Sequence, residues 1–596
     1  MRLCARRGRR VLAVAACLLA ARYACAGISV DIEGVSATLR DNVSAYLSLT
    51  RYAKRSVDAA TMDRLEDRIV RETREALEPF GYYQPTVKYH VTADGNGSWN
   101  AAIGIDPGPP VIVKSVEVEI SGPGRDDPRF ERIAGHPLLE PGDRLLHAAY
   151  GQMKTELETT AATYGYFDAR MLRNELIVNP RARSARIILE MATGVRYRFG
   201  LTTIEQKVID ARLARRYLRY RKGDPYDQSK LLDTQFALDD SDYFSTVAVQ
   251  PGVPDHVRHI VPVLIRARPN LRDRYSFSGG YGTDTGPRGT LQWDRTRIGT
   301  EGDRFGVQLE ASKLLQVLQA LYTIPAGDPA VDRLALAATA DYGIPGNLID
   351  KDFAIGPSLT RVVGRWQYVF AVMPTRSITY DGITTQTQTL LIPSITIGSV
   401  PTGYLGQALL QQGLVAQLRG GVSLAGPGGR FLQLHVTGQH TFNLSQRWHL
   451  LLRGEAGTSI APQITDLPGS LRFFAGGEGS VRGFEYDDLS PVQAQLTPSG
   501  HTVYLKIGGR DVLTGSAEVV RDVTRHIGIA AFADAGNAFD TFGRSGNSVY
   551  PHFIEYSAGL GLLWRLPVLT LGVDVAQPLS RPGAGPRFDI YFGPRL

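Results

Sequence analysis

The sequence predicts three α+β repeats followed by an antiparallel transmembrane β-barrel of about 16 strands. Three observations support this fold class. Helical stripes that end in a corner containing an aromatic residue recur three times within residues 27–270. Residues 271–596 consist of alternating apolar and polar runs broken by Gly, Pro, Asn and Asp. Beyond the first 26 residues no apolar run reaches about 18 residues, so a membrane can be entered only as a β-barrel.

The first 26 residues have the layout of a secretory signal peptide. They contain six Arg and no Lys, Asp or Glu, and they include an apolar run from Val11 to Ala21. The small residues Ala24-Cys25-Ala26 then predict cleavage after Ala26. Removing this segment leaves 60 basic and 59 acidic residues, so the formal net charge falls from +7 to +1. It also removes all three Cys. We therefore expect an exported protein without disulfides, and its charge does not favour a nucleic-acid binder.

The repeats are recognised by their helix-to-strand corners, which are Gly81-Tyr82-Tyr83, Gly165-Tyr166-Phe167 and Asp242-Tyr243-Phe244. The corners lie 84 and then 77 residues apart. Each unit opens with a strand pattern, continues with helical patterns and closes with two strand patterns after the corner. This predicts the order β-α-α-β-β in three units, with domains at residues 27–110, 111–194 and 195–270.

Residues 271–596 carry the period-two pattern that a membrane barrel requires. For example, Leu432, Leu434 and Val436 alternate with polar neighbours, as expected when one face meets lipid and the other meets the lumen. The first strand is expected near Arg274–Gly282 and the last near Arg587–Gly593. About 20 residues per strand and connection then give about 16 strands.

One connection, about residues 460–510, is too long for an ordinary turn. Its segment Arg472–Phe484 contains four glycines, which indicates tight backbone turns. Arg482 stands among apolar neighbours and is expected at the tip of a plug that folds into the lumen. Period two places Phe532 and Asp534 on one face of a later strand. Arg482 could then form a charge-assisted pair with Asp534; alternatively, one is a solvated loop cation and the other a lumen-facing acid.

These residues carry a family resemblance. Val481-Arg482-Gly483-Phe484 resembles the V/I-R-G-F/Y signature of the BamA/TamA/two-partner-secretion superfamily of outer-membrane insertases and transporters. Phe532-Ala533-Asp534 resembles its F-x-D motif, and Gly515 and Glu518 resemble its G…E pattern. The N-terminal units resemble POTRA domains. The presence of three such units is similar to the TamA-like branch of the superfamily, whose members carry three POTRA domains. The resemblance implies a loop lock made of Val481, Arg482, Gly483, Phe484, Phe532, Asp534, Gly515 and Glu518.

The resemblance also implies a place and a mode of action. The barrel would lie in the Gram-negative outer membrane with its POTRA domains in the periplasm. Its first and last strands would pair weakly and accept a client strand by β-augmentation, which helps to insert or secrete β-barrel proteins such as autotransporters. Gly593-Pro594 would break the last strand. The lateral seam residues would be Tyr275, Gly279, Gly280, Phe588, Ile590, Phe592, Gly593 and Pro594.

The implied partners are outer-membrane lipid, a TamB-like inner-membrane-anchored protein and nascent outer-membrane or autotransporter polypeptides, with no nucleic acid. No cofactor, metal or catalytic residue is expected, because the sequence lacks a P-loop, H-E-x-x-H, C-x-x-C and a Gly-Xaa-Ser-Xaa-Gly nucleophile turn. We therefore expect a protein that is not an enzyme. Two other classes stay open: a two-partner-secretion type polypeptide transporter, and a plain diffusion porin with a periplasmic anchor.

Overall fold

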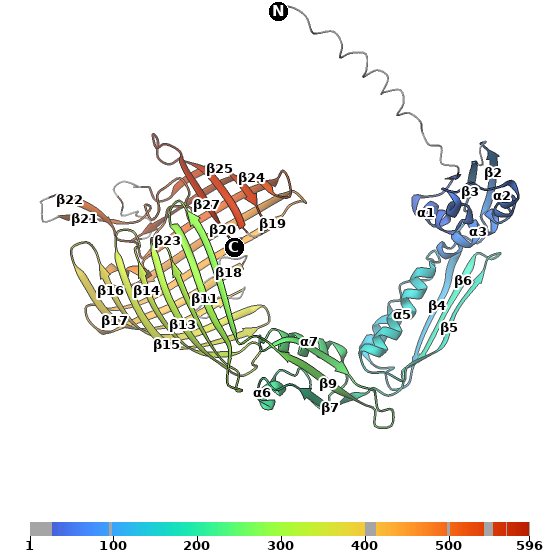
Figure 1. Ribbon diagram of the computed structural model, residues 1–596, viewed down its shortest axis with the longest axis horizontal. Helices are drawn as coiled ribbons and strands as arrows, with labels where there is room; N and C mark the ends of the chain where they lie inside the picture. Colours follow the sequence, from blue (N-terminus) through green and yellow to red (C-terminus); the bar gives the residue numbers. More distant parts are fainter. Residues whose placement is uncertain are drawn as a thin grey trace, which may run out of the picture. The chain divides into compact units, whose positions relative to one another are not determined.

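The computed structural model describes residues 27–94, 98–399, 413–496, 501–541, 547, 552–567 and 569–594. The predicted signal peptide, residues 1–26, lies outside this range. Within it, no helix is both long and apolar enough to cross a membrane. The chain divides into two compact units: the first two repeats belong to one unit and the barrel to the other, and residues of the third repeat are divided between them. Figure 1 labels the elements of both.

Three small sheets with helices form the N-terminal part, which confirms the predicted β-α-α-β-β order. The first repeat carries one more helix than predicted, and its strand order is β1-β3-β2. The second and third repeats have the equivalent orders β4-β6-β5 and β7-β9-β8. The elements are β1 (Ile28–Glu33), α1 (Ala37–Tyr46), α2 (Ala59–Glu66), α3 (Ile69–Leu77), β2 (Thr86–Ala93), β3 (Trp99–Asp106); β4 (Ile112–Ser121), α4 (Pro128–Gly135), α5 (His147–Thr163), β5 (Arg170–Asn179), β6 (Ser184–Ala192); β7 (Arg198–Glu205), α6 (Ala211–Arg216), α7 (Gln228–Asp239), β8 (Phe244–Pro251) and β9 (Ile260–Pro269).

The three corners share one backbone conformation. Gly81 and Gly165 have φ angles of +86° and +83°, the left-handed region in which glycine meets no steric penalty. In the third repeat Asp242 takes this position with φ of +57°. Aspartate is among the few other residues that tolerate this region, because its short side chain can bond locally. The Gly/Asp difference between the corners is therefore compatible with one shape.

Each corner also joins its repeat to the next module of the chain. The carbonyl of Gly81 accepts a hydrogen bond from Val111 N–H at 2.8 Å, and the carbonyl of Gly165 accepts one from Tyr197 N–H at 2.8 Å. At the third corner the carbonyl of Tyr243 accepts from Asn270 N–H at 2.9 Å. The same short backbone bond thus links each corner to the start of its successor.

The first of these joints has a side-chain contact as well. Tyr83 Oη and His147 Nε2 are 2.6 Å apart and connect the first corner to the start of α5. Burial raises the pKa of Tyr83 to about 12 and lowers the pKa of His147. Both side chains are therefore neutral near pH 7, and the joint needs no counter-ion.

The C-terminal part is a closed antiparallel barrel of 16 strands, which confirms the predicted class and strand number. Alternation is visible in β19, where Gln433 is buried toward the lumen while Leu432 and Leu434 are exposed on the outer face. A separate hairpin, β21 (Val492–Leu496) and β22 (Thr502–Lys506), belongs to the long connection. The barrel strands are β10 (Asp273–Gly282), β11 (Gly286–Ile298), β12 (Asp303–Ala311), β13 (Leu315–Pro325), β14 (Arg333–Gly343), β15 (Ile349–Val363), β16 (Trp366–Tyr380), β17 (Thr385–Gly398), β18 (Gly413–Ala425), β19 (Arg430–Asn443), β20 (Trp448–Ile460), β23 (Asp511–Asp522), β24 (Ile527–Phe539), β25 (Glu555–Arg565), β26 (Leu569–Pro578) and β27 (Arg587–Pro594).

The third corner packs against the turn between β11 and β12. Tyr243 is fully buried, its hydroxyl donates to the carbonyl of Gly302 at 2.6 Å, and the Arg304 guanidinium lies 4.6 Å from its ring centre. Tyr243→Phe is expected to cost about 1–3 kcal/mol because the Gly302 carbonyl loses its buried partner. Tyr243→Ala is expected to cost about 3–5 kcal/mol because a cavity is added. Thermal unfolding of the full chain measures both changes.

The control for this prediction is Tyr46→Phe, since Tyr46 is an exposed tyrosine of α1. It is expected to leave stability within about 0.5 kcal/mol of the starting protein. Equal melting temperatures for Tyr243→Phe and Tyr46→Phe would show that the hydroxyl of Tyr243 does not hold the turn.

Candidate functional site

The long connection between β20 and β23, residues 461–510, reaches the inner face of the barrel. Its tight turns are made by Gly476, Gly477 and Gly483, which have φ angles of +104°, +94° and +91°. A side chain at these positions would be strained, so the glycines allow the sharp reversals that bring the tip of the loop to the wall. The tip is closed by its own bonds, since the Gly476 N–H donates to Ser480 Oγ at 3.3 Å.

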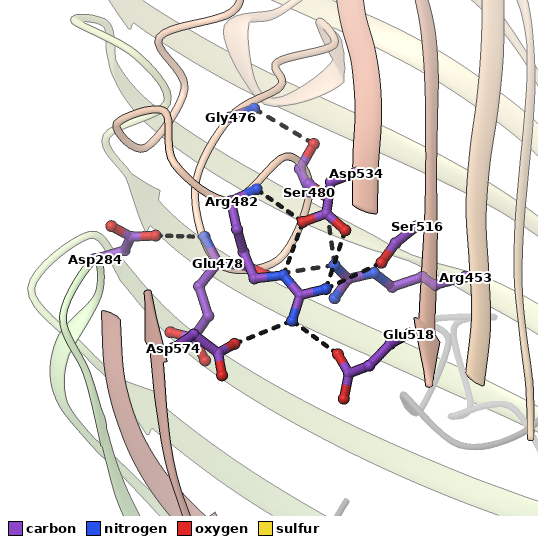
Figure 2. A network of polar contacts seen from close by, with 10 residues as sticks. All are labelled: Asp284, Arg453, Gly476, Glu478, Ser480, Arg482, Ser516, Glu518, Asp534 and Asp574. Atoms are coloured by element: carbon purple, nitrogen blue, oxygen red, sulfur yellow. Dashed lines mark hydrogen bonds and ion pairs between the residues drawn. The ribbon is translucent and has the colours of Figure 1, made fainter. Parts of the chain in front are cut away.

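Arg482 forms the centre of a polar cluster between the loop and three strands (Figure 2). Its Nε and Nη2 donate to the two carboxylate oxygens of Asp534 in β24, at 2.7 and 3.0 Å, in a bidentate pair. Its Nη1 donates to Glu518 in β23 at 2.8 Å and to Asp574 in β26 at 3.0 Å. Nη2 also donates to Ser516 Oγ at 3.2 Å. Arg482 is only 5% exposed, so these bonds lie where water competes little.

The backbone of the loop takes part in the same contact. The Arg482 N–H donates to Asp534 Oδ2 at 3.1 Å, so one carboxylate binds both the side chain and the main chain of the same residue. The Arg482 guanidinium also lies 3.4 Å from the centre of the Phe532 ring. The ring covers the flat face of the cation while the carboxylates surround its edge. Both residues of the F-x-D motif therefore contact Arg482.

The neighbours of Arg482 in the loop pack into an apolar cluster. Val481 and Phe484 are buried together with Phe473, Ala475, Leu489, Val512 and Ala538. Gly483 packs closely against β26: a Cβ added to Gly483 would lie 3.3 Å from the Cβ of Ala576. Apolar burial on both sides of Arg482 excludes water from the ion pairs, which strengthens them.

Seven of the eight predicted loop-lock residues meet at this place, and Gly515 does not contact the loop. Gly515 lies in β23 opposite Gly454 and Ala535, and a Cβ there would meet nothing within 4 Å. Sequence reasoning missed Asp574 and Ser516. Asp574 carried a signal, because it is the one acid in the alternating run Leu569–Val575 and lies on its polar face.

The charge of the cluster is not balanced by Arg482 alone. Three carboxylates surround one guanidinium, and all three are buried. A second cation, Arg453 of β20, donates more weakly to the loop carbonyls of Glu478 and Ser480 at 3.4 Å. Figure 2 shows Arg453 directed toward the same cluster. Such an arrangement binds the loop strongly. Removing the arginine would leave buried carboxylates without a counter-ion, which is energetically unfavourable.

The junction between β10 and β27, which we call the seam, is the second feature of the barrel. Among the described residues it consists of two ladder pairs, Tyr281 with Phe592 and Gly282 with Tyr591. On its other side β27 pairs with β26 over eight residues, and β10 pairs with β11 over ten. Among the described residues, Asp273–Gly280 has no ladder partner on the seam side. A row of backbone donors and acceptors is therefore available there.

The predicted seam residues divide into two groups. In β10, Tyr275, Gly279 and Gly280 lie on the part without a ladder partner, and Tyr275 is 76% exposed. In β27, Phe592 belongs to the paired part, and its ring stacks on Tyr281 with 5.8 Å between the ring centres. Phe588 and Ile590 are exposed on the outer face of the same strand.

The prediction that the last strand breaks at Gly593-Pro594 is wrong for its pairing with β26, whereas the described pairing with β10 does stop before these two residues. Gly593 and Pro594 continue in register opposite Thr570 and Leu569 of β26. Proline fits extended backbone at a strand end, where its missing N–H removes at most one ladder bond. In the register of the seam, Gly593 and Pro594 stand opposite Gly280 and Gly279, so the described pairing with β10 stops beside these residues while the pairing with β26 continues.

The site offers buried charged side chains and unpaired backbone groups, and both kinds of group bind protein chain through hydrogen bonds. Within the described ranges no group of three or more His, Cys, Asp or Glu has the arrangement of a metal site. The loop is bound to the wall through its ion pairs, and the two described ladder pairs join the strands of the seam.

Comparisons with known proteins agree with this architecture. Residues 409–594 match the Omp85 superfamily domain, and residues 29–107 match the POTRA domain TamA domain 1. The outer membrane protein assembly factor BamA of Neisseria meningitidis serogroup B is 28% identical over 186 residues, which are 26% of this chain. The match spans 23% of that relative, so the chain aligns with about a quarter of its length.

One solved structure resembles the fold, and a second match is weaker. BamA from Haemophilus ducreyi lacking POTRA domains 1-3 has a TM-score of 0.65 at 14% identity, covering 81% of this chain and 99% of that chain. CdiB from Acinetobacter baumannii has a TM-score of 0.45 at 13% identity, covering 81% of this chain and 90% of that chain. The chain carries an Omp85 superfamily domain and a TamA-type first POTRA domain, and it is an outer-membrane β-barrel protein with N-terminal POTRA repeats.

Proposed function

We propose that this protein is an assembly and translocation factor that helps to insert or secrete β-barrel proteins such as autotransporters. The observation that carries the proposal is the seam, where Asp273–Gly280 of β10 has no ladder partner on one side among the described residues. The family matches support the coarser part, an assembly role without enzymatic chemistry. The seam supports the finer part, in which a client strand enters the wall of the barrel.

The physical reason is the cost of unpaired backbone inside a bilayer. Each N–H or C=O without a partner costs several kcal/mol in hydrocarbon, so an open edge there favours any strand that can pair with it. A client strand that adds to β10 would satisfy these groups by β-augmentation. It would also place apolar side chains beside the exposed Tyr275 and Phe277. Binding energy thus comes from backbone bonds that most client sequences can supply.

We further propose that the POTRA repeats dock a TamB-like partner in the periplasm. In the first repeat β3 is the central strand, so β1 and β2 each leave one edge free for pairing within the sheet. Such edges bind extended segments of other proteins. Partner binding at the repeats and client binding at the seam would then use the same physical mode.

A disulfide across the seam tests the proposal. Tyr281 and Phe592 are opposite each other, and residues 27–596 contain no Cys, so Tyr281→Cys/Phe592→Cys can be oxidised selectively. We expect oxidation to lower the assembly rate of an autotransporter client in vesicles at least severalfold, because the seam cannot part. A reducing agent should restore the rate.

The matched control is a disulfide that staples two strands away from the seam. Leu450→Cys/Val519→Cys joins β20 to β23, which pair over nearly their whole length. This staple should leave the assembly rate unchanged. Full client assembly by the oxidised seam variant would contradict entry at the seam and would favour passage through the lumen, as in a two-partner-secretion transporter.

A further inference from the structure

Asp284 joins three segments that are far apart in the sequence. It lies in the turn between β10 and β11, and its side chain is 2% exposed. Its Oδ2 accepts a hydrogen bond from the backbone N–H of Glu478 in the long loop at 2.7 Å. Its Oδ1 accepts one from Arg587 Nη2 in β27 at 2.5 Å. One buried carboxylate therefore connects the first strand, the loop tip and the last strand.

The contact between Asp284 and the loop depends on a glycine. Gly477 has a φ angle of +94°, and a Cβ there would lie 2.6 Å from Asp284 Oδ2. A larger residue would therefore be strained and would also displace the carboxylate from the Glu478 N–H. Figure 2 shows Asp284 bonded to Glu478 on the side of the Arg482 cluster that contains Asp574.

Asp284 also stands at the closed end of the seam. Directly before it, Thr283 N–H donates to the Ile590 carbonyl at 3.0 Å, and Thr283 Oγ1 accepts from Ile590 N–H at 2.7 Å. The two paired residues of β10, Tyr281 and Gly282, come immediately before Thr283. The bonds that keep β27 on β10 are thus gathered at this end, next to the Asp284–Arg587 ion pair.

We propose that Asp284 is a positioning residue that couples the loop lock to the seam. While Arg482 holds the loop on the barrel wall, the Glu478 N–H is presented to Asp284, and the carboxylate is oriented toward Arg587. Release of the loop removes that hydrogen bond, frees the carboxylate to turn away and weakens the closed end of the seam. The inference rests on the proposed function, because it concerns the junction at which a client strand would enter.

The test measures seam closure without any client. The full chain with Tyr281→Cys/Phe592→Cys is placed in lipid vesicles, and the initial rate of disulfide formation under a mild oxidant is recorded. Asp284→Asn is expected to lower this rate about threefold to tenfold, the effect of losing a charge-assisted hydrogen bond. Gly477→Ala, which disturbs the loop contact and keeps both partners of the Asp284–Arg587 pair, should lower it in the same direction.

The control is Asp522→Asn, which removes a carboxylate that pairs with Arg565 in the barrel wall away from the seam. It should leave the rate unchanged. Coupling is shown when Arg482→Ala lowers the rate in the presence of Asp284 and adds nothing in the Asp284→Asn background. The proposal is overturned when Asp284→Asn behaves like Asp522→Asn, or when Arg482→Ala lowers the rate equally in both backgrounds. Because no client is present, a negative client assay bears on the proposed function and not on these rates.

Discussion

Replacing Arg482 with alanine is expected to release the loop from the barrel wall and to lower stability by about 3–5 kcal/mol. The change removes the cation that binds Asp534, Glu518 and Asp574 directly. Three buried carboxylates then repel one another in a place where water enters poorly. Such a loss corresponds to a change of about a hundredfold or more in the population of the bound loop. Urea unfolding of the vesicle-bound barrel and client assembly measure it.

Two further variants separate the charge from the geometry. Arg482→Lys keeps the charge but loses the fork that binds Asp534 in a bidentate manner, so it should recover only part of the stability. The control is Arg510→Ala at the base of the loop, whose pair with Asp540 is partly exposed. An exposed pair of this kind contributes about 1 kcal/mol or less.

The contact itself is examined with a double-mutant cycle. Arg482→Ala and Asp534→Ala remove the two sides of one interaction, so their combined effect should be clearly smaller than the sum of the single effects. Additive losses would show that each residue stabilises the barrel through other neighbours, and the loop lock would then need a different basis.

Much of this site could be predicted from short-range sequence rules. Period two in β24 is a local property, so the common face of Phe532 and Asp534 followed from the residues between them. The glycines around Arg482 indicated a sharply turned loop in the same way. The strand number followed from chain length and alternation, since a closed barrel fixes how much chain each strand uses.

The remainder depends on relations that a single sequence does not contain. Asp574 reaches Arg482 because β26 lies two strands from β24 in the closed barrel, although 40 residues separate Asp534 from Asp574. Asp284 meets Arg587 because the barrel closes on itself and brings together residues 303 positions apart. The continued pairing of Pro594 likewise depends on its neighbour strand, whereas the sequence shows only that proline lacks a donor.

Adding a side chain at Gly559 is expected to disturb the loop lock by displacing the Phe532 ring, on which the Arg482 guanidinium packs. Gly559 lies opposite Phe532 in the neighbouring strand, and a Cβ there would come 2.3 Å from the Phe532 ring and 2.3 Å from the Val575 carbonyl. The ring therefore lies against the glycine, and the Arg482 guanidinium also packs on this ring. Gly559→Val is expected to cost about 2–4 kcal/mol, because backbone and ring must both move in a packed wall.

The effect at Gly559 should reach the loop as well as the barrel. When the Phe532 ring is displaced, Arg482 loses the surface that covers its flat face and the alignment of its fork with Asp534. Urea unfolding should show the stability loss, and protease access to the loop should rise with it. Gly420→Ala in β18 is the matched control, since the nearest atom to its Cβ would be 3.6 Å away. The prediction would be contradicted if Gly559→Val lowered the stability while the loop stayed protected from protease. Gly559 would then matter for the packing of the barrel wall and not for the contact between Phe532 and Arg482.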